Sequence, residues 1–299
     1  MIAKVDRGAG RGARVKVGRQ ESGMTGASIG RWLAWIFSLV LALLSILPIL
    51  WILVTSFKTF IETQQVPPVW PSFTNWDNYV SQFMGDSSAL GPLIHSLIVA
   101  SVTMLVTIVV SVPAAYSLAR YRIRRKQDIQ FWIISSRMMP LIAAVIPLSA
   151  LLRFVGLYDT IPGLIVVYVG VNLSFAVWLL TIFFQGVPLD VEQAAHLDGL
   201  TRYGVLWYIS IPLARSSIFV VAIFTWIFSW NELLNSLVLT TGATETLPVF
   251  LSRFASNTQT AFQQMAAVAM VQILPAVVIT FLAQKYIVSG LSLGALSGE

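Results

Sequence analysis

The chain has 299 residues, of which 57% are hydrophobic and 11% charged, and its formal net charge is +6. Soluble domains carry about 25% charged residues, so this composition excludes an ordinary soluble protein. The chain has no cysteine, which excludes disulfides, thiolate metal sites and cysteine nucleophiles.

Residues 1–31 form a basic segment that is rich in glycine and arginine and poor in apolar residues. We expect a disordered tail, because such a segment cannot bury enough apolar surface to fold. Its basic residues are Lys4, Arg7, Arg11, Arg14, Lys16, Arg19 and Arg31. Retention of the tail on one side of a membrane explains this charge without a nucleic-acid partner.

Six apolar blocks follow, each long enough to cross a hydrocarbon core that needs about 20 helical residues. They are residues 32–54, 96–118, 129–152, 161–184, 217–239 and 266–288. They lack the alternation of barrel strands, and only helices or closed barrels satisfy backbone polar groups in lipid. The sequence predicts an all-α membrane protein with six transmembrane helices in residues 32–289, followed by a tail, 290–299. The first block lacks a small-residue cleavage site, so we expect an uncleaved span.

The distribution of basic residues predicts the orientation. The loop after the second block holds Arg120, Arg122, Arg124, Arg125 and Lys126. Under the positive-inside rule, this loop and the basic tail are cytoplasmic. An even number of spans then places both termini and the loop 185–216 in the cytoplasm.

The first half of the loop 185–216 has the pattern of a short helix. Asp190 suits an N-cap, and Gln193 stands where the return half of a capping box belongs. Val191, Ala194 and Ala195 then share one helical face, where small side chains allow the close approach of a partner. Asp198 and Gly199 supply a stop, since glycine suits the left-handed cap.

The second half of the loop predicts another short helix. Thr201 can cap it, and Pro212 is expected to end or bend it. Two short helices around a glycine, tethered between membrane spans, are suited to transmitting a rigid push.

The same segment resembles the EAA loop of ABC-importer permeases, in which an E-A-A-x-x-x-G core is followed nine residues later by I-x-L-P. The matching positions are Glu192, Gln193, Ala194, Ala195, Asp198, Gly199, Ile209 and Pro212. Two positions depart from the pattern: Gln193 replaces the family's glutamate, and Ile211 replaces its leucine. The family docks this cytoplasmic coupling helix on an ATP-hydrolysing subunit.

Further segments are similar to the carbohydrate-uptake, maltose-transporter-type permeases, over roughly residues 32–296. The matching pieces are Ser56-Phe57-Lys58, Asn78-Tyr79, Ser96-Leu97-Ile98-Val99, Ala114 to Tyr121, Gly156 to Thr160, Trp230-Asn231-Glu232, Thr246 to Val249 and Tyr286 to Ala295.

The resemblance implies a type I ABC-importer permease of the bacterial cell membrane, serving uptake of a sugar, glycoside or polyol. It implies four kinds of partner: a second homologous permease, two ABC ATPase subunits, an extracytoplasmic substrate-binding protein and the carbohydrate. ATP and Mg²⁺ would be used by the ATPases, and this chain would bind no cofactor. In the family the segment after the last helix also reaches the ATPases, which implies contacts at Gly290 and Gly294.

Polar and aromatic residues inside the spans are candidates for the substrate pathway. They are Arg137, Trp226, Trp230, Asn231, Glu232 and Asn235. A charge within a span is costly, so its default interpretation is functional. The alternatives are snorkelling or pairing within the bundle for Arg137, and hydrogen bonding to the partner permease for the residues around Glu232.

No enzyme motif in the sequence has the required context. Two stretches match G-x-S-x-G, at 26–30 and 290–294, but neither follows a predicted strand or has a partnered histidine. No phosphate-binding G-x-x-x-x-G-K-[ST] loop and no metal-ligand cluster is present in the sequence. We therefore expect no catalytic residue and no metal site. An ATP-independent six-helix carrier or channel is the alternative function, and an intramembrane hydrolase using Ser292 is a third.

Overall fold

The computed structural model describes residues 24–71, 73, 75–85, 88–256 and 261–295. Every regular element within these residues is helical, which confirms the prediction of an all-α membrane protein. Five continuous helices are long and apolar enough to cross a membrane: Gly30–Ser56, Leu90–Arg120, Ile161–Gln185, Arg202–Trp230 and Phe262–Gln284. A bent pair, Lys126–Ser136 with Leu141–Phe154, brings the number to six if it is one span.

Helix α1 (Met24–Ser56) lies mostly in a compact unit of its own, residues 1–51. Its large apolar side chains from Trp32 to Trp51 are exposed. A helix that is apolar on all sides is stable in lipid rather than in water. It begins within the segment 1–31 predicted as a tail, and residues 1–23 lie outside the described part.

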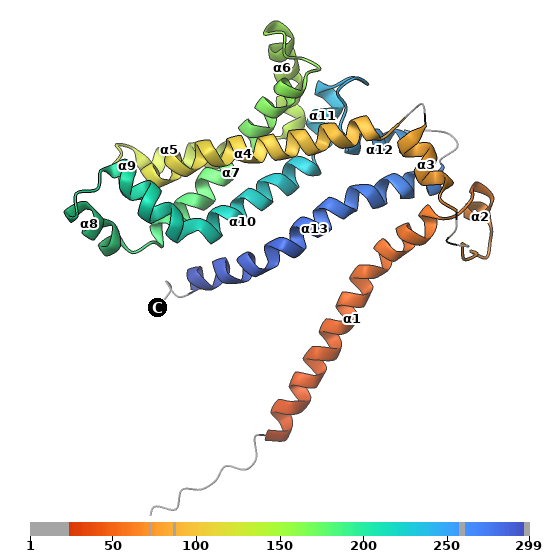
Figure 1. Cartoon of the computed structure of the whole chain (residues 1–299), viewed down its shortest axis with the longest axis horizontal. Coiled ribbons are helices and arrows are strands. Elements are labelled where there is room, and N and C mark those ends of the chain that lie inside the picture. The colour runs from red at the N-terminus through yellow and green to blue at the C-terminus, as the bar shows by residue number, and fades with distance from the viewer. Residues whose placement is uncertain (1–23, 72, 74, 86–87, 257–260, 296–299) are drawn as a thin grey trace, which may run out of the picture. The chain divides into compact units, whose positions relative to one another are not determined.

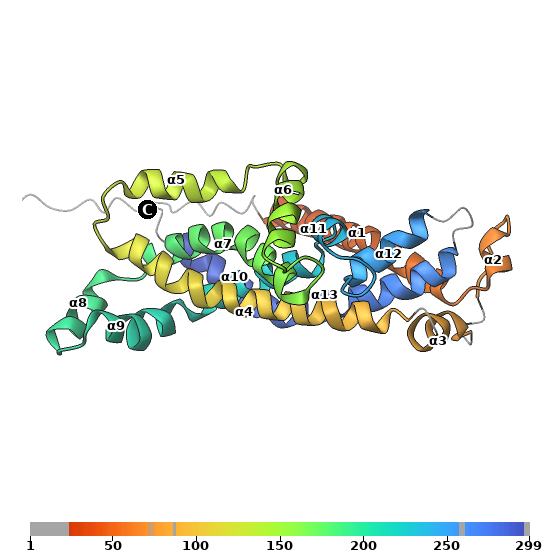
Figure 2. The same cartoon turned by 90° about the horizontal axis from the view of Figure 1, so that it is seen from above.

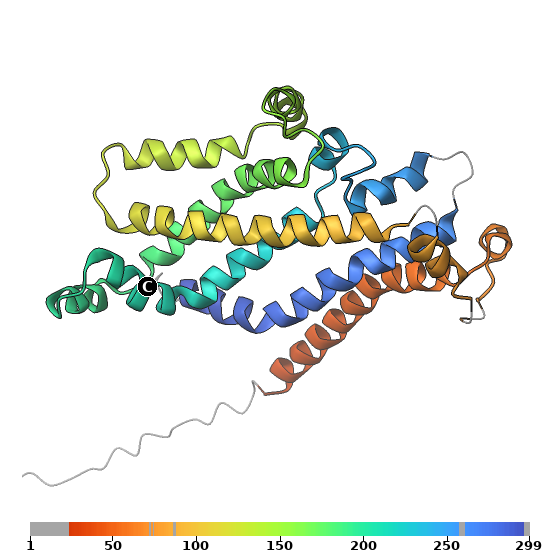
Figure 3. The same cartoon turned by 45° about the horizontal axis from the view of Figure 1, so that its top comes forward.

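The second unit, residues 52–299, contains a bundle of four long helices (Figures 1 and 3). They are α4 (Leu90–Arg120), α7 (Ile161–Gln185), α10 (Ile211–Trp230) and α13 (Phe262–Ala295). Helix α4 packs on α7 and α10, and α10 packs on α13. Fully buried Ala115 of α4 and Ala176 of α7 belong to one core cluster. Such small residues allow membrane helices to pack closely.

Short helices occupy the two ends of this bundle (Figure 1). Those at one end are α2 (Phe60–Gln64), α3 (Asp77–Met84) and α12 (Leu247–Ser256). Those at the other end are α8 (Leu189–Leu197) and α9 (Arg202–Val205). The predicted spans 96–118, 161–184 and 266–288 are confirmed, since each lies within α4, α7 or α13.

The third predicted span, 129–152, is wrong as a single continuous helix. Helix α5 (Lys126–Ser136) runs beside α7, and α6 (Leu141–Phe154) turns away from it by 91° (Figure 2). Pro140 explains the break, because it lacks an N–H and disfavours the helical conformation at the residue before it.

The fifth predicted span, 217–239, is also interrupted. Helix α10 ends at Trp230, and a separate short helix, α11 (Leu234–Leu239), packs against α6. The Glu232 carboxylate accepts backbone N–H groups of Leu234 and Asn235 at 3.1–3.2 Å. A side chain that binds its own backbone in this way competes with helix continuation and starts a new helix instead.

Candidate functional site

The predicted coupling loop, 185–216, begins with helix α8. Pro188 occupies the N-cap and no side chain caps the helix, so the predicted capping box of Asp190 with Gln193 is wrong. Pro188 fixes an extended entry two residues earlier than expected, which places Asp190 inside the helix. Asp190 and Glu192 instead lie in the first turn, where negative charge favours the positive end of the helix dipole.

The turn between α8 and α9 follows the prediction. Gly199 has φ +91°, the left-handed conformation that glycine adopts without strain. The N–H of Leu200 donates to the carbonyl of Ala195 at 3.0 Å, which closes the end of α8. Thr201 caps α9, because its hydroxyl accepts the N–H of Gly204 at 3.3 Å.

The second half of the loop is continuous with a membrane span. A π-helical turn, η1 (Leu206–Ser210), joins α9 to α10, and the N–H of Ile211 donates to the carbonyl of Leu206. Pro212 lies in the first turn of α10, so of the two predicted outcomes, an end or a bend of a second short helix, the end is wrong. The widened turn accommodates the proline, which cannot donate a regular helical hydrogen bond.

Glu192 is the buried centre of the loop, with 5% of its surface exposed. From the last turn of α4, Arg120 donates to the Glu192 carboxylate through Nε at 2.8 Å and through Nη2 at 3.0 Å. From η1, the Ser210 hydroxyl donates to the same carboxylate at 2.8 Å. The Tyr116 hydroxyl lies 3.4 Å from it, and Arg120 also donates to the carbonyl of Val187 at 2.8 Å.

These contacts fix three elements to one another. The carboxylate belongs to α8, the guanidinium to α4 and the serine to η1, and 72 residues separate Glu192 from Arg120. Two-pronged arginine–carboxylate pairs combine charge with a fixed geometry. Removing one partner of a buried pair leaves an uncompensated charge, so the α8–α4–η1 arrangement is strongly specified.

Large side chains are exposed around this buried pair. Leu197 is 89% exposed, Tyr203 80%, Tyr208 75% and Trp207 64%; we call these four residues the loop surface. Gln193 and Ala194 are exposed on α8 as well, whereas Ala195 is buried. Exposed apolar groups of this size at one end of a bundle are typical of a protein interaction site.

Arg137 follows α5 directly, at the break before α6, and is exposed. Its guanidinium carbon lies 4.8 Å from the ring centre of Phe175 on α7 and 5.2 Å from that of Phe228 on α10. The two rings meet edge to face at 5.3 Å. Arg137 therefore lies over an aromatic pair, at the break within the bent pair α5–α6.

Most of the other predicted pathway residues are buried or bind the backbone. Trp226 and Trp230 stack at 5.0 Å and are 4% and 1% exposed, and their indole nitrogens bond Ser101 and the carbonyl of Gln272. Asn235 is also buried. These residues belong to the packed interior. Glu232, as described above, starts α11.

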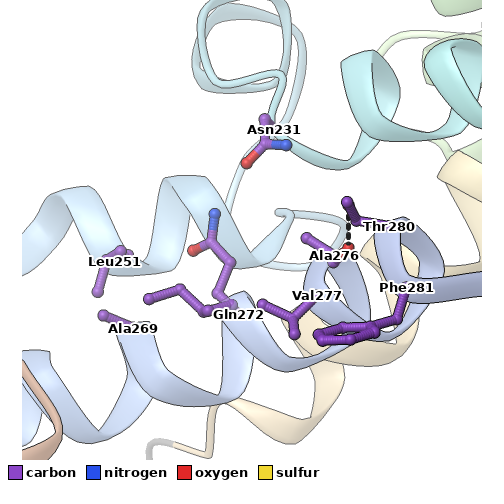
Figure 4. A pocket seen from close by; sticks show the side chains of 9 residues that line it. Asn231, Leu251, Ala269, Gln272, Ala276, Val277, Thr280 and Phe281 are labelled. Carbon is purple, nitrogen blue, oxygen red and sulfur yellow. Dashed lines mark hydrogen bonds between the residues drawn. The ribbon is translucent and has the colours of Figure 1, made fainter. Parts of the chain in front are cut away.

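Asn231, in contrast, is exposed and lines an open pocket of about 540 Å³ with residues of α12 and α13. The amide of Gln272 points toward Asn231 above the apolar side chains of Val277 and Phe281 (Figure 4). Two amides over an apolar floor are suited to a ligand with both hydroxyl groups and C–H surface.

A polar cluster ties together the end of the bundle opposite α8. Asp159 accepts the backbone N–H of Thr241 at 2.8 Å and the hydroxyls of Thr241 and Thr244. Burial raises the pKa of the Asp159 carboxyl, but these hydrogen bonds outweigh it and hold the pKa below its ordinary value. Nearby, Glu245 forms an ion pair with Arg253.

Gly290 and Gly294 lie in the last turns of α13. The helix therefore continues through most of the segment 290–299 predicted as a tail, up to Ala295.

Comparison with known proteins identifies the class. Residues 108–293 match the family described as the inner membrane component of binding-protein-dependent transport systems. The chain belongs to this family, and its relatives show that it is a multi-pass permease of the ABC-importer type.

Three of the most similar relatives are permeases named for the transport of sugars. The trehalose transport permease SugB of Mycobacterium tuberculosis is 36% identical to this chain, in an alignment that covers 85% of this chain and 93% of SugB. The sulfoquinovosyl glycerol permease SmoH of Agrobacterium fabrum is 31% identical, covering 92% and 97%. The trehalose/maltose permease MalG of Thermococcus litoralis is 30% identical, covering 90% and 98%. The resemblance to carbohydrate-uptake permeases is confirmed.

One solved structure has the same fold. It is a bacterial ABC transporter that imports the acidic polysaccharide alginate, with a TM-score of 0.73 at 21% identity, covering 88% of this chain and 98% of the other.

Sequence reasoning missed the partners of Glu192. Arg120 was interpreted only as part of a basic loop and of the family-like segment Ala114 to Tyr121, and nothing in the local pattern connects it to a glutamate 72 residues away. Phe175 and Phe228 were missed as well, because aromatic residues inside apolar spans are typical of lipid contact or core packing.

Proposed function

We propose that this chain is the permease subunit of an ATP-driven importer for a sugar, glycoside or polyol. It forms the translocation pathway with a second homologous permease and receives its solute from an extracytoplasmic binding protein. The family description supports the binding protein. The relatives named for trehalose, sulfoquinovosyl glycerol and maltose share a sugar unit, which supports a carbohydrate.

Coupling to two ATPase subunits runs through the 190–210 helices. The observation that carries this proposal is the Glu192 carboxylate, buried and clamped by Arg120 and Ser210 beneath the loop surface. A partner that moves α8 then moves α4 and η1 with it. Exposed Gln193 and Ala194 face the ATPase, whereas buried Glu192 holds α8 to α4 and η1. The end of α13, with Gly290 and Gly294, makes a second contact with the ATPases.

The orientation follows from the charge bias. The loop 185–216 and both termini are cytoplasmic, on the side where ATP is found. The ATPases bind ATP and Mg²⁺, and this chain binds no cofactor. Among the predicted pathway residues, exposed Arg137 and Asn231 face the solute, while Trp226, Trp230 and Asn235 support the wall behind them and Glu232 fixes the start of α11.

Reconstitution with and without the ATPases tests the function. We expect uptake of a radiolabelled sugar into liposomes only when both permeases, the ATPases, the binding protein and ATP are present. Uptake by the permeases alone would establish the alternative, an ATP-independent carrier.

A matched pair of variants tests the docking surface. Leu197→Ser changes an exposed apolar residue of the loop surface, and Met84→Ser changes one that is 83% exposed at the other end of the bundle. We expect Leu197→Ser to weaken ATPase binding by at least about tenfold, as for a central interface residue. Met84→Ser should leave it unchanged. Equal ATPase copurification in both variants would exclude the loop surface as the docking site.

A further inference from the structure

The break between α5 and α6, inside the bent pair that counts as one candidate span, carries a cation, Arg137. Helix α5 has 11 residues, so its end lies about 16 Å from its start at 1.5 Å per residue. The helix runs beside α7 in the bundle (Figure 2), so Arg137 stands one helix length away from the basic loop 120–126.

Arg137 has no counter-charge within the described part of the chain. Two ion pairs are described in this part of the chain, one between Arg120 and Glu192 and one between Arg253 and Glu245. Arg137 takes part in neither. The two phenyl rings provide its described contacts. Aromatic faces attract a cation through their quadrupole only and carry no negative charge. The arrangement holds the guanidinium in place and leaves its charge uncompensated.

Two hydroxyl groups come from residues next in sequence to Arg137 and to Phe175. Ser136, the last residue of α5, and Ser174 of α7 are 2.7 Å apart through their Oγ atoms, and this contact is exposed. Ser136 precedes Arg137 and Ser174 precedes Phe175 in the sequence. The contact between the two serines therefore joins α5 to α7 one residue along each helix from the cation and from the Phe175 ring.

We propose that Arg137, Phe175 and Phe228 form a subsite for an acidic sugar, one that carries a carboxylate or sulfonate group. The guanidinium fork pairs with the acid group through two parallel hydrogen bonds. The rings pack against the C–H face of the sugar ring, and Ser136 and Ser174 bind its hydroxyls. This subsite rests on the proposed function, since it deepens the solute specificity of the same pathway.

Uptake of matched probes tests the charge preference. Liposomes containing the complete importer would be supplied with digalacturonate, sulfoquinovose and their neutral counterparts, digalactose and glucose. We expect uptake of an acidic probe, with a KM that rises at least about 30-fold in Arg137→Gln, as when one partner of a desolvated charge pair is lost. Arg153→Gln is the control, because Arg153 also lies over an aromatic ring, that of Tyr158, but at the end of α6.

Two results would overturn the subsite. One is uptake of neutral probes only, and the other is an Arg137→Gln variant that transports like Arg153→Gln. Should Arg137→Gln not reach the membrane, Phe228→Leu keeps the charge and removes one ring. A rise in KM of about threefold or more is then expected from the lost aromatic contact, and an unchanged KM contradicts the proposal.

The absence of cysteine from the sequence permits a direct test of charge at this position. Arg137→Cys would be treated with methanethiosulfonates that attach either an ammonium or a sulfonate group. We expect the ammonium reagent to restore uptake of the acidic probe, the sulfonate reagent to abolish it, and the bound probe to slow both reactions. Equal effects of the two reagents without protection would identify Arg137 as a structural residue paired with the other permease.

The outcomes separate the two proposals. Uptake without ATPases contradicts the importer and leaves the subsite intact. ATP-dependent uptake restricted to neutral sugars contradicts the subsite and leaves the importer intact.

Discussion

Replacing Arg120 by leucine removes the cation that holds α8 in place. The Glu192 carboxylate, 5% exposed, loses two N–H donors at 2.8 and 3.0 Å and keeps the Ser210 hydroxyl. Breaking a buried ion pair from one side costs about 3–5 kcal/mol, and the retained serine favours the lower figure. A loss of about 3 kcal/mol lowers the ratio of docked to undocked α8 by roughly 10².

Hydrogen exchange followed by mass spectrometry measures this ratio on the assembled importer. We expect amides of α8, and that of Leu200 behind it, to exchange up to about 10² faster in Arg120→Leu. Sugar transported per ATP hydrolysed should fall, while basal ATP hydrolysis persists. Arg124→Leu is the control, because Arg124 is exposed in the same basic loop.

The double variant Arg120→Leu/Glu192→Leu separates pairing from packing. Removing both charges leaves no buried ion without a partner, so we expect the double variant to recover much of the lost protection. Unchanged exchange in Arg120→Leu, or strictly additive effects of the two single changes, would refute the assignment of the pair as the anchor of α8.

Two further predictions concern the turn after α8 and the opposite end of the bundle. Gly199→Pro forces φ to about −65° where the structure has +91°; we expect at least about a tenfold loss of uptake with normal membrane insertion, whereas Gly186→Ala, at φ −76°, should transport normally. The depressed pKa of Asp159 stabilises the fold fully above the unfolded value of about 3.9, and this stabilisation is lost as pH falls through the folded value. Thermal unfolding of purified protein between pH 2.5 and 6 should therefore show a loss of stability at acid pH that is smaller in Asp159→Asn; identical pH profiles would contradict this role.

The sequence predicted the long spans because their apolar runs are unambiguous, and it predicted the turn at Gly199 and Thr201 because local chemistry determines it. The breaks in the third and fifth spans had local causes as well. Pro140 was visible in the third, but the apolar average over 129–152 concealed it. In the fifth span, Glu232 was interpreted as a charged pathway residue because it lies within an apolar run. Its capacity to bind backbone N–H groups and to start a new helix was not considered.

The partners of Glu192 and Arg137 could not be predicted in the same way. Each contact joins residues far apart in the chain, and the helix packing that brings them together depends on many side chains at once. The two buried tryptophans show that a suitable composition alone does not make a binding site. Trp226 and Trp230 have the composition of a sugar-stacking site, yet they stack on each other within the core.

The π-helical turn η1 makes the segment Arg202–Trp230 one uninterrupted rod of 29 residues. At 1.5 Å per residue its length is about 43 Å. If the rod tilts by about 5° about its α9 end, simple geometry moves Trp230 sideways by nearly 4 Å, about the width of a methylene group. Phe228 lies on the same rod, so a small rotation beside Gly199 is amplified into a displacement large enough to separate this ring from Arg137.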